Sequence, residues 1–508
     1  MYLGIEFGST RIKATAIDRG FLPQYNGDYT WQSTYENGIW TYDLQQALQG
    51  LRAALSGLQN PKEIQAVGIS GMMHGYLAFD RDWNLLVPFR TWQNTVTAQA
   101  AEELTALFGF NIPQRWSVAH LYQAMLNGEE HVSRIAHVTT LAGYIHYLLT
   151  GVHAVGIGEA SGIFPIDSQT LSYNRTMLEQ CNKLFQEFGW NRPVEEVFPT
   201  VLRAGTPAGF LTAKGAALTG NVLKEGTPFA PPEGDAGTGM VATNAVAART
   251  GNISAGTSVF SMLVLEKPLR RVYSEIDMVT TPAGKAVAMV HCNNCTADSN
   301  AWASLLLEAA KLFGAEPSGG ALFEALYRTS LEGEADCGGV LACNYLAGEG
   351  ITHLDAGVPM VLRRAESRFT LANFLRATLY SSIATLRLGM EILEEEGVKT
   401  DSLVGHGGFF KTPEVGQRYM AAACNAPITC MKTAGEGGPY GMALLAAFLF
   451  AEEESLELFL SERVFKTAEK TTVFPDQATV EGFQRYMKDY KKLLELERKA
   501  VEMSKKDE

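Results

Sequence analysis

Two short segments of this sequence place a glycine before two hydroxyl residues, between stretches that read as β-strands. The first is Gly8-Ser9-Thr10 and the second is Gly256-Thr257-Ser258, about half of the 508-residue chain apart. A hairpin turn of this kind presents backbone N–H groups and hydroxyls to an anion, and its glycine lets a phosphate approach the backbone. Such turns are common, so one copy alone means little. Two copies at this spacing predict a duplicated fold that grips a polyphosphate between its halves.

An acidic residue lies among glycines shortly before the second of these turns. Residues 233–239 read E-G-D-A-G-T-G, with Asp235 at the centre. A carboxylate in such a setting can accept a proton from a hydroxyl during phosphoryl transfer, while the glycines let a substrate come close. An isolated G-D-A-G segment is more often a solvated turn. The catalytic interpretation therefore depends on the two hydroxyl turns around it.

A third group of residues has the composition of a polyol-binding site. Met73 and His74 follow an apolar stretch at 64–70 that reads as a strand, and Trp92 and Gln93 follow an arginine. A histidine at a strand end can reach a sugar hydroxyl, and an aromatic face beside amides suits a polyol. The structural alternative is a histidine bonded to local backbone and a tryptophan in the core.

Residues 405–413, G-H-G-G-F-F-K-T-P, connect an expected strand to an expected helix. A turn at the carboxyl end of a strand is the usual ligand side of an open α/β sheet. We expect the helix to begin at Pro413, because proline suits the first helical position.

The remaining sequence predicts a framework that presents these turns. Hairpins are expected at 2–17 and 251–265, and each is followed by alternating strand and helix patterns. The expected helices lie at 43–57, 97–108, 121–126, 141–149, 299–313, 371–396, 413–424, 437–453 and 483–502. This order predicts an α/β fold with mixed sheets that occurs twice.

Composition narrows the classes of protein and of partner. A chain of 508 residues predicts two large or three smaller domains. The net charge of −13 disfavours nucleic acid and anionic membranes as partners. No apolar run is long enough for a transmembrane helix, and the first apolar stretch contains Glu6, so we expect no signal peptide. Seven irregularly spaced cysteines indicate a reducing cytosol, and for the C-x-x-C of Cys292 and Cys295 we expect a structural role.

Taken in order, these segments resemble the motifs of the FGGY carbohydrate kinases, within the actin/hexokinase/Hsp70 ATPase superfamily, and are most similar to the xylulokinases among them. The resemblance extends over residues 1–450. The two hydroxyl turns resemble the family's phosphate motifs, and residues 68–75 resemble its sugar-binding run. Residues 234–239 resemble its catalytic-aspartate loop, and 407–413 its adenosine motif. Each motif alone has low specificity, whereas their order is highly specific.

The resemblance implies two ribonuclease-H-like domains, 1–247 and 248–508, with ATP and a sugar in the cleft between them. It also implies transfer of the ATP γ-phosphoryl group to a sugar hydroxyl, with Mg²⁺. By position, Asp235 is the general base. The implied sugar-binding residues are Met73, His74, Trp92, Gln93 and Asp235. The implied ATP-binding residues are Ser9, Thr10, Lys13, Gly256, Thr257, Ser258, Gly407, Gly408 and Phe409. Glu6 and Asp235 are the implied Mg²⁺ residues, directly or through water.

Four positions, in three segments, depart from the family pattern. Glu6 stands where aspartate is usual, and its extra methylene moves the carboxylate. Phe409 and Phe410 stand where glycine and alanine are usual, at the expected adenosine site. Met72 stands where glutamine is common, beside the expected sugar site.

The function predicted from these observations is an ATP-dependent ketopentose kinase of the cytoplasm. D-Xylulose and L-ribulose are both compatible with the motifs. The alternative within the class is an aldonate kinase such as a gluconokinase, because the M-H-G run is shared. More remote alternatives are a sugar-independent ATPase and a sugar sensor of the same superfamily. The expected partners are the sugar and ATP, without nucleic acid or membrane, and a homodimer is left open.

Overall fold

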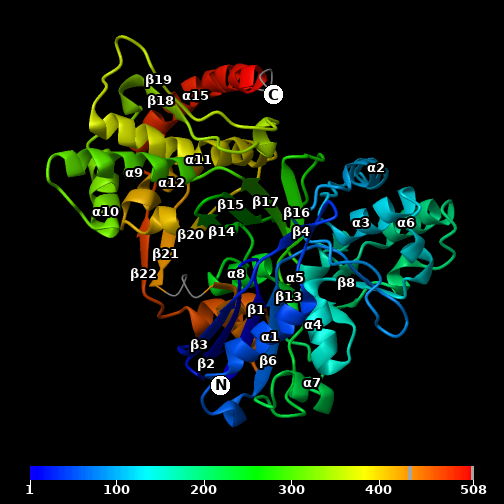
Figure 1. Cartoon of the computed structure of the whole chain (residues 1–508). Coiled ribbons are helices and arrows are strands. Elements are labelled where there is room, and N and C mark those ends of the chain that lie inside the picture. Colours follow the sequence, from blue (N-terminus) through cyan, green and yellow to red (C-terminus); the bar gives the residue numbers. More distant parts are fainter. Residues whose placement is uncertain (433–436, 505–508) are drawn as a thin grey trace. The chain divides into compact units, whose positions relative to one another are not determined.

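The computed structural model describes residues 1–432 and 437–504 (Figure 1). The described chain forms two compact units. The first unit contains residues 1–248, 271–287 and 437–468, and the second contains 249–270, 288–432 and 469–504. The chain first passes from one unit to the other between Ala248 and Arg249, next to the expected division at 247/248. Two later segments pack with the first unit, so the compact units are discontinuous in sequence; the continuous domains 1–247 and 248–508 stay a prediction.

The first unit is built on a mixed sheet that carries the first hydroxyl turn. Its strand order is β13 (Glu233–Gly234), β6 (Ala66–Gly71), β1 (Tyr2–Phe7), β2 (Arg11–Ile17) and β3 (Pro23–Thr30). β1 pairs antiparallel with β2 and parallel with β6. β1 and β6 are apolar runs buried on both faces, whereas residues of β3 alternate between partly buried and exposed, as an edge strand with one covered face should.

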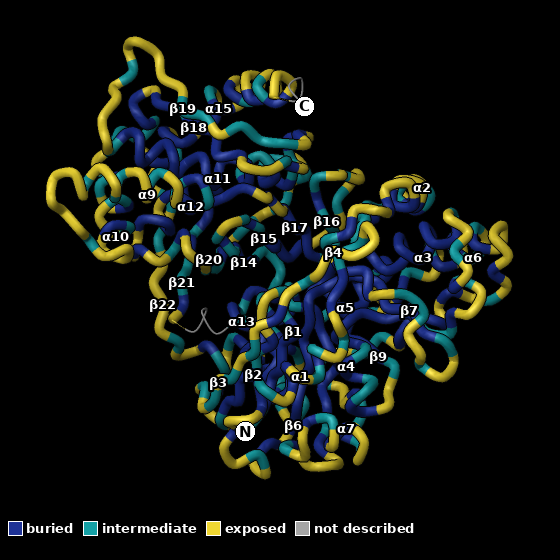
Figure 2. The backbone as a smooth tube through the Cα atoms, in the orientation of Figure 1, coloured by how far each residue is buried: buried dark blue, intermediate teal, exposed yellow. Residues whose placement is uncertain are grey.

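Helices cover both faces of this sheet. α1 (Leu44–Leu55) packs on β2 and β3, and the Asp43 side chain caps its first turn by accepting from Gln45 N at 2.8 Å. α4 (Leu141–Thr150) packs on β6 and ends at Gly151 in the left-handed conformation. α8 (Asp235–Ala242) and α13 (Gly437–Phe448) pack against each other, and α13 also covers β1 and β6. Figure 2 shows α13 beside β1.

The close packing of α13 on β1 requires glycine at the contact. A Cβ atom at Gly4 would lie 2.0 Å from the Pro439 carbonyl oxygen. The helix that was expected at 437–453 is present, but it ends at Phe448.

The first unit also contains shorter elements around this framework. Its other strands are β4 (Thr34–Glu36), β5 (Ile39–Thr41), β7 (Leu77–Phe79), β8 (His137–Thr139), β9 (Ala154–Gly156), β10 (Ile166–Asp167), β11 (Ser172–Tyr173), β12 (Thr200–Leu202) and β16 (Ile276–Thr280). Its other helices are α2 (Ala98–Phe108), α3 (Ser117–Leu126), α5 (Ile157–Ala160), α6 (Arg175–Gln186), α7 (Ala213–Leu218) and α14 (Leu456–Leu458).

The second unit repeats the sheet plan of the first. Its strands follow in the order β17 (Ala286–Cys292), β15 (Val259–Val264), β14 (Thr250–Ala255), β20 (Ser402–His406), β21 (Ile428–Met431) and β22 (Lys470–Val473). β14 pairs antiparallel with β15 and parallel with β20, as β1 does with β2 and β6. The predicted α/β fold with two mixed sheets, each beginning with a hairpin, is confirmed.

The helices of the second unit are α9 (Ala297–Leu312), α10 (Gly319–Ser330), α11 (Leu371–Glu395), α12 (Val415–Cys424) and α15 (Gln477–Ser504), with a small hairpin of β18 (Val340–Cys343) and β19 (Met360–Arg363). α11 is mostly buried along its length, in contrast to α9 (Figure 2). The expected start of α12 at Pro413 was wrong. Glu414 has a φ of 70°, which is incompatible with a helix, so α12 begins at Val415. Among the described helices, none is long and apolar enough to cross a membrane.

Candidate active site

The first hydroxyl turn joins β1 to β2 and is held by two aromatic side chains. Trp31 Nε1 donates to the Gly8 carbonyl at 2.7 Å, and the Tyr42 hydroxyl donates to the Ser9 carbonyl at 2.7 Å. These bonds fix the backbone of the turn from the core side. The side chain of Thr10 is exposed and that of Ser9 is partly exposed. The turn therefore keeps its hydroxyls available to a ligand on a rigid backbone.

The second hydroxyl turn joins β14 to β15 in the same way. The Thr296 hydroxyl donates to the Gly256 carbonyl at 2.7 Å, and Cys295 N donates to the Thr257 carbonyl at 2.9 Å. Thr257 is exposed and Ser258 is partly exposed, and there is open space where a Cβ of Gly256 would lie. Each unit thus presents one anchored turn of the type predicted to bind phosphate.

The C-x-x-C motif lies next to this second turn, and both of its cysteines are part of the protein interior. Cys292 and Cys295 are both buried free thiols, and burial raises the pKa of each. Cys295 supports the second turn through its backbone. Among residues 1–432 and 437–504, no group of three or more His, Cys, Asp or Glu side chains could hold a metal ion.

Asp235 is the first residue of α8, directly after β13. Its Oδ1 accepts from Met73 N at 3.1 Å and from Ala236 N at 3.0 Å. Burial raises the pKa of Asp235, although these backbone N–H groups and the charge of Lys13 oppose the rise. The bond to Met73 connects the predicted base to the predicted sugar segment. A positioned carboxylate with a raised pKa is suited to accept a proton.

Glu6 and Lys13 face each other across β1 and β2 beside Asp235. Their register is one-to-one, and Glu6 Oε1 lies 3.6 Å from Lys13 Nζ. Burial raises the pKa of Glu6 to about 7; Lys13 lowers it and the charge of Asp235 raises it further. The start of α13 closes the other side, because a Cβ at Gly438 would lie 1.6 Å from Glu6 Oε2. Glu6 is thus a buried carboxylate that interacts electrostatically with Asp235.

These side chains fit a magnesium ion. Mg²⁺ in phosphoryl-transfer sites is usually held by one or two carboxylates, with phosphates and waters completing its shell. Glu6 and Asp235 supply two carboxylates whose mutual repulsion a divalent cation would relieve.

Two buried glutamates beneath Asp235 were not predicted as site residues. Glu159 in α5 and Glu233 in β13 are almost fully buried, and Glu233 Oε2 accepts from Glu159 N at 2.8 Å. Burial raises the pKa of Glu233 to about 8 and that of Glu159 well above its usual range. A Cβ at Gly234 would lie 2.6 Å from Glu159 Oε2, so this carboxyl packs against the backbone next to Asp235. The only signal in the sequence was the position of Glu233 in the glycine-containing segment 233–239.

The sugar segment has a strained turn at His74. His74 has a φ of 73° and Gly75 a φ of 92°, both in the left-handed region. His74 is buried and its ring stacks on Trp116, with centroids 6.3 Å apart. Burial, together with the charge of Arg115, lowers the pKa of His74 well below its usual range, so the ring is neutral at physiological pH. Its Nδ1 has no hydrogen-bond partner among the described residues.

Trp92, which precedes Gln93, bonds to the first hydroxyl turn. Trp92 is 40% exposed, and its Nε1 donates to Ser9 Oγ at 3.2 Å. Gln93 Oε1 is buried and lacks a hydrogen-bond partner among the described residues. The loop is held by Asn94, which exchanges two 2.8 Å hydrogen bonds with the Trp40 backbone. The first unit thus brings together the predicted base, sugar segment and first phosphate turn.

The glycine turn after β20 lies beside the second hydroxyl turn. Gly407 has a φ of 100°, and a Cβ there would lie 2.4 Å from the Ala255 carbonyl oxygen, so only glycine fits. Phe409 was expected to border the nucleotide, and this expectation stays a prediction. Phe409 is fully buried and packs against Tyr327, with centroids 6.2 Å apart. Gly408 has open space around its Cα and remains a candidate for ligand contact.

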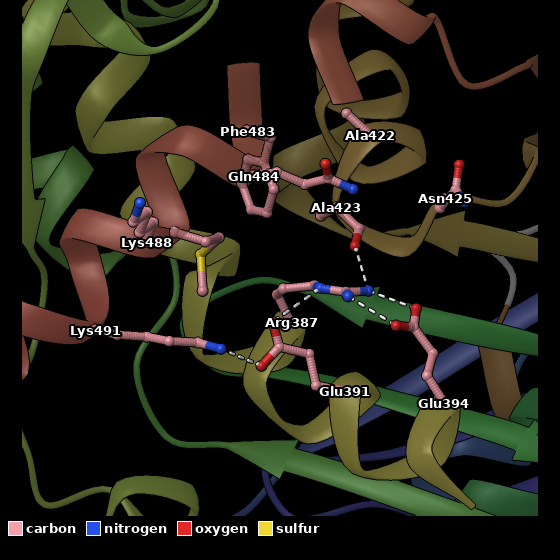
Figure 3. Close-up of a pocket in the computed structure, with 11 residues that line it drawn as sticks. Arg387, Glu391, Glu394, Ala422, Ala423, Asn425, Phe483, Gln484, Lys488 and Lys491 are labelled. Atoms are coloured by element: carbon pink, nitrogen blue, oxygen red, sulfur yellow. Dashed lines mark hydrogen bonds and ion pairs between the residues drawn. The ribbon is translucent and has the colours of Figure 1, made fainter. Parts of the chain in front are cut away.

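A charged recess elsewhere in the second unit is not part of this site. It encloses about 460 Å³ between α11, α12 and α15 (Figure 3). Arg387 forms ion pairs with Glu391 and Glu394, and Lys491 Nζ lies 2.7 Å from Glu391 Oε2. These cations are compensated by carboxylates of the recess itself. We interpret the recess as a structural contact of the terminal helix.

Comparisons with known proteins agree with the motif order. The model of the N-terminal domain of the FGGY family of carbohydrate kinases matches residues 1–242, and the model of its C-terminal domain matches residues 251–450. A xylulose kinase of Haemophilus influenzae is 24% identical over 515 residues, covering 96% of this chain and 98% of that protein.

Two solved structures share the fold over nearly the whole chain. The xylulose kinase of Rhodospirillum rubrum has a TM-score of 0.80 at 17% identity, covering 99% of both chains. The gluconate kinase of Lactobacillus acidophilus has a TM-score of 0.77 at 16% identity, covering 97% of this chain and 96% of its own. At these identities, the likeness establishes the fold and does not distinguish between the two substrates.

Proposed function

This chain belongs to the FGGY family of carbohydrate kinases, and we propose that it transfers the γ-phosphoryl group of ATP to a hydroxyl of a ketopentose. The observation that carries the proposal is the hydrogen bond from Met73 N to Asp235 Oδ1. This bond holds a carboxylate with a raised pKa against the segment expected to bind the sugar.

In the proposed mechanism, Asp235 accepts the proton of the sugar hydroxyl as its oxygen attacks the γ-phosphorus. Catalysis of this reaction depends mainly on positioning and on stabilising the charge of the phosphoryl oxygens. The two backbone N–H bonds to Oδ1 orient the carboxylate. Lys13 lies beside Glu6, and its side chain is 39% exposed, so we propose that its ammonium group assists in binding the phosphates. Mg²⁺, when bound near Glu6 and Asp235, would neutralise phosphate charge.

The residues proposed to hold ATP lie in the two hydroxyl turns and in the glycine turn after β20. Ser9 and Thr10 of the first turn, and Gly256, Thr257 and Ser258 of the second, offer hydroxyls and backbone N–H groups to phosphates. Gly407 and Gly408 are proposed to contact the nucleoside. The support is the shared construction of the two turns, together with the close packing of Gly407 on the strand that leads into Gly256.

An uncharged polyol suits the sugar segment better than an acid. His74 is neutral at physiological pH, because burial lowers its pKa. Arg115, whose charge reaches His74, is paired with Asp277, and Arg90 is paired with Glu129. These pairs leave no net positive charge from either arginine for a carboxylate ligand. We therefore favour D-xylulose or L-ribulose over an aldonate, and the name of the Haemophilus influenzae relative agrees with the former.

The proposal also includes the cellular setting. All seven cysteines are free in the structure, which supports a reducing compartment such as the cytoplasm.

A coupled assay of ADP release tests the proposed function. D-Xylulose, L-ribulose, D-gluconate and glycerol are each supplied with ATP and Mg²⁺, and one reaction contains no sugar. We expect ADP release to depend on a sugar and to be fastest with one of the two ketopentoses. Release that is indifferent to every sugar would identify a sugar-independent ATPase instead, and a preference for D-gluconate would identify an aldonate kinase.

A further inference from the structure

Arg115 is built into the sugar segment of the first unit. Its backbone carbonyl accepts from Gly75 N at 3.0 Å, directly after His74. The next residue, Trp116, stacks on the His74 ring with an angle of 17° between the planes. The Arg115 charge is also close enough to lower the pKa of His74. A cation at this position would attract an acidic substrate if nothing compensated it.

Asp277 compensates this cation from a distant part of the sequence. Its Oδ2 accepts from the Arg115 guanidinium, and both residues belong to the first unit. Asn111 Nδ2 donates to Asp277 Oδ1 at 3.3 Å and to the Ile276 carbonyl at 3.0 Å, which holds β16 in place. The Arg115 side chain is 24% exposed and that of Asp277 is 14% exposed. Solvent therefore screens this pair less than it screens a surface ion pair.

The two substrate classes differ in charge, and the Arg115–Asp277 pair should therefore affect their binding differently. A ketopentose is uncharged, whereas an aldonate carries a carboxylate at physiological pH. A lone Arg115 would bind that carboxylate well, since guanidinium and carboxylate form charge-assisted hydrogen bonds. An Arg115 already bonded to Asp277 has no net charge to offer, and Asp277 itself repels a second carboxylate.

We propose that Asp277 determines substrate specificity by neutralising Arg115, so that the sugar site selects an uncharged polyol and excludes aldonates. This inference rests on the proposed function, because it concerns the substrate class of the same site. It assigns the exclusion to an acidic residue outside all of the motifs described above.

The test is Asp277→Asn, which keeps the shape of the side chain and removes its charge. In this variant the charge of Arg115 is no longer cancelled. For an aldonate carboxylate about 6 Å from it, at an effective dielectric constant near 20, the attraction would change the binding constant of the aldonate by up to about a hundredfold. Partial exposure reduces this, so we expect kcat/KM for D-gluconate relative to D-xylulose to rise about tenfold. The rise should shrink at high salt, because screening weakens it.

Two further variants serve as controls. Asp401→Asn breaks an exposed pair with Arg249 in the second unit, changes the net charge equally, and should leave the substrate ratio unchanged. Adding Arg115→Met to Asp277→Asn should abolish the gain for D-gluconate, which a merely loosened site would not predict. An unchanged ratio in a folded Asp277→Asn enzyme that still phosphorylates D-xylulose would overturn the inference.

Failure of the proposed function gives a different result. If the wild-type protein phosphorylates no ketopentose, that proposal fails in the first assay. Calorimetric titration of D-gluconate into wild-type and Asp277→Asn protein then still measures the charge effect. Binding that is no tighter in the variant would refute the role of Asp277 by itself.

Discussion

Replacing Asp235 by asparagine should separate its chemical role from its structural role. Asp235 Oδ1 accepts two backbone hydrogen bonds, from Met73 and from Ala236. An asparagine carbonyl oxygen can accept both, so the start of α8 and the sugar segment should keep their positions. The variant loses the ability to take up a proton, and we expect ATP affinity to change little.

The expected loss of turnover follows from the proposed role. A positioned general base contributes about 10²–10⁴ in rate, which corresponds to about 3–5 kcal/mol of transition-state stabilisation. Because burial raises the pKa of Asp235, wild-type activity should fall with decreasing pH at a higher pH than an ordinary aspartate would give. That acid limb should be absent from the residual activity of Asp235→Asn.

The same substitution should stabilise the fold. A carboxyl whose pKa is higher in the folded chain binds its proton more tightly there, so stability falls as pH rises from the unfolded pKa through the folded one. Above the folded pKa, the charge of Asp235 therefore destabilises the fold. Asparagine removes that charge while keeping both hydrogen bonds, so its unfolding temperature at pH 8 should equal or exceed that of the wild type.

Three measurements on purified protein decide the matter: kcat with the preferred sugar, ATP affinity, and the thermal unfolding temperature. Near-normal kcat in Asp235→Asn would refute the assignment of the base. A large fall in unfolding temperature would show that the charge of Asp235, rather than its hydrogen bonds, holds the start of α8.

Two further predictions concern the contact between α13 and β1. In Gly438→Ala the new Cβ would lie 1.6 Å from Glu6 Oε2, so we expect a loss of about 1–3 kcal/mol in urea unfolding. The control Gly320→Ala has open space around it and should lose nothing; equal stability of both variants would contradict the tight contact. The folded pKa of Glu6 is about 7, above its unfolded value, so wild-type stability should fall between pH 4.5 and 7 by up to about 3 kcal/mol relative to Glu6→Gln. If the free energies of unfolding of these two proteins changed with pH in parallel, the fold would not raise the pKa of Glu6.

The sequence by itself determined the features that depend on local backbone chemistry. The turns at Gly8 and Gly256 and the strands around them appear where the sequence predicts them. Their signals are short-range, because glycine and hydroxyl residues specify a turn and apolar alternation specifies its strands. A short-range signal also predicted the wrong start for α12. Proline favours the first position of a helix, but this preference does not predict the φ of 70° at Glu414.

Only the tertiary structure decided which side chains are buried together. Phe409 lies in a glycine turn that reads as a ligand site, and packing against Tyr327 places it in the core. Glu233 and Glu159 meet beneath the predicted base although 74 positions separate them, and Arg115 meets Asp277 across 162 positions. No periodicity records such contacts, because they arise from the way whole strands and helices pack. The sequence thus predicted a kinase and its base, whereas the fold revealed which charges near the sugar segment are cancelled.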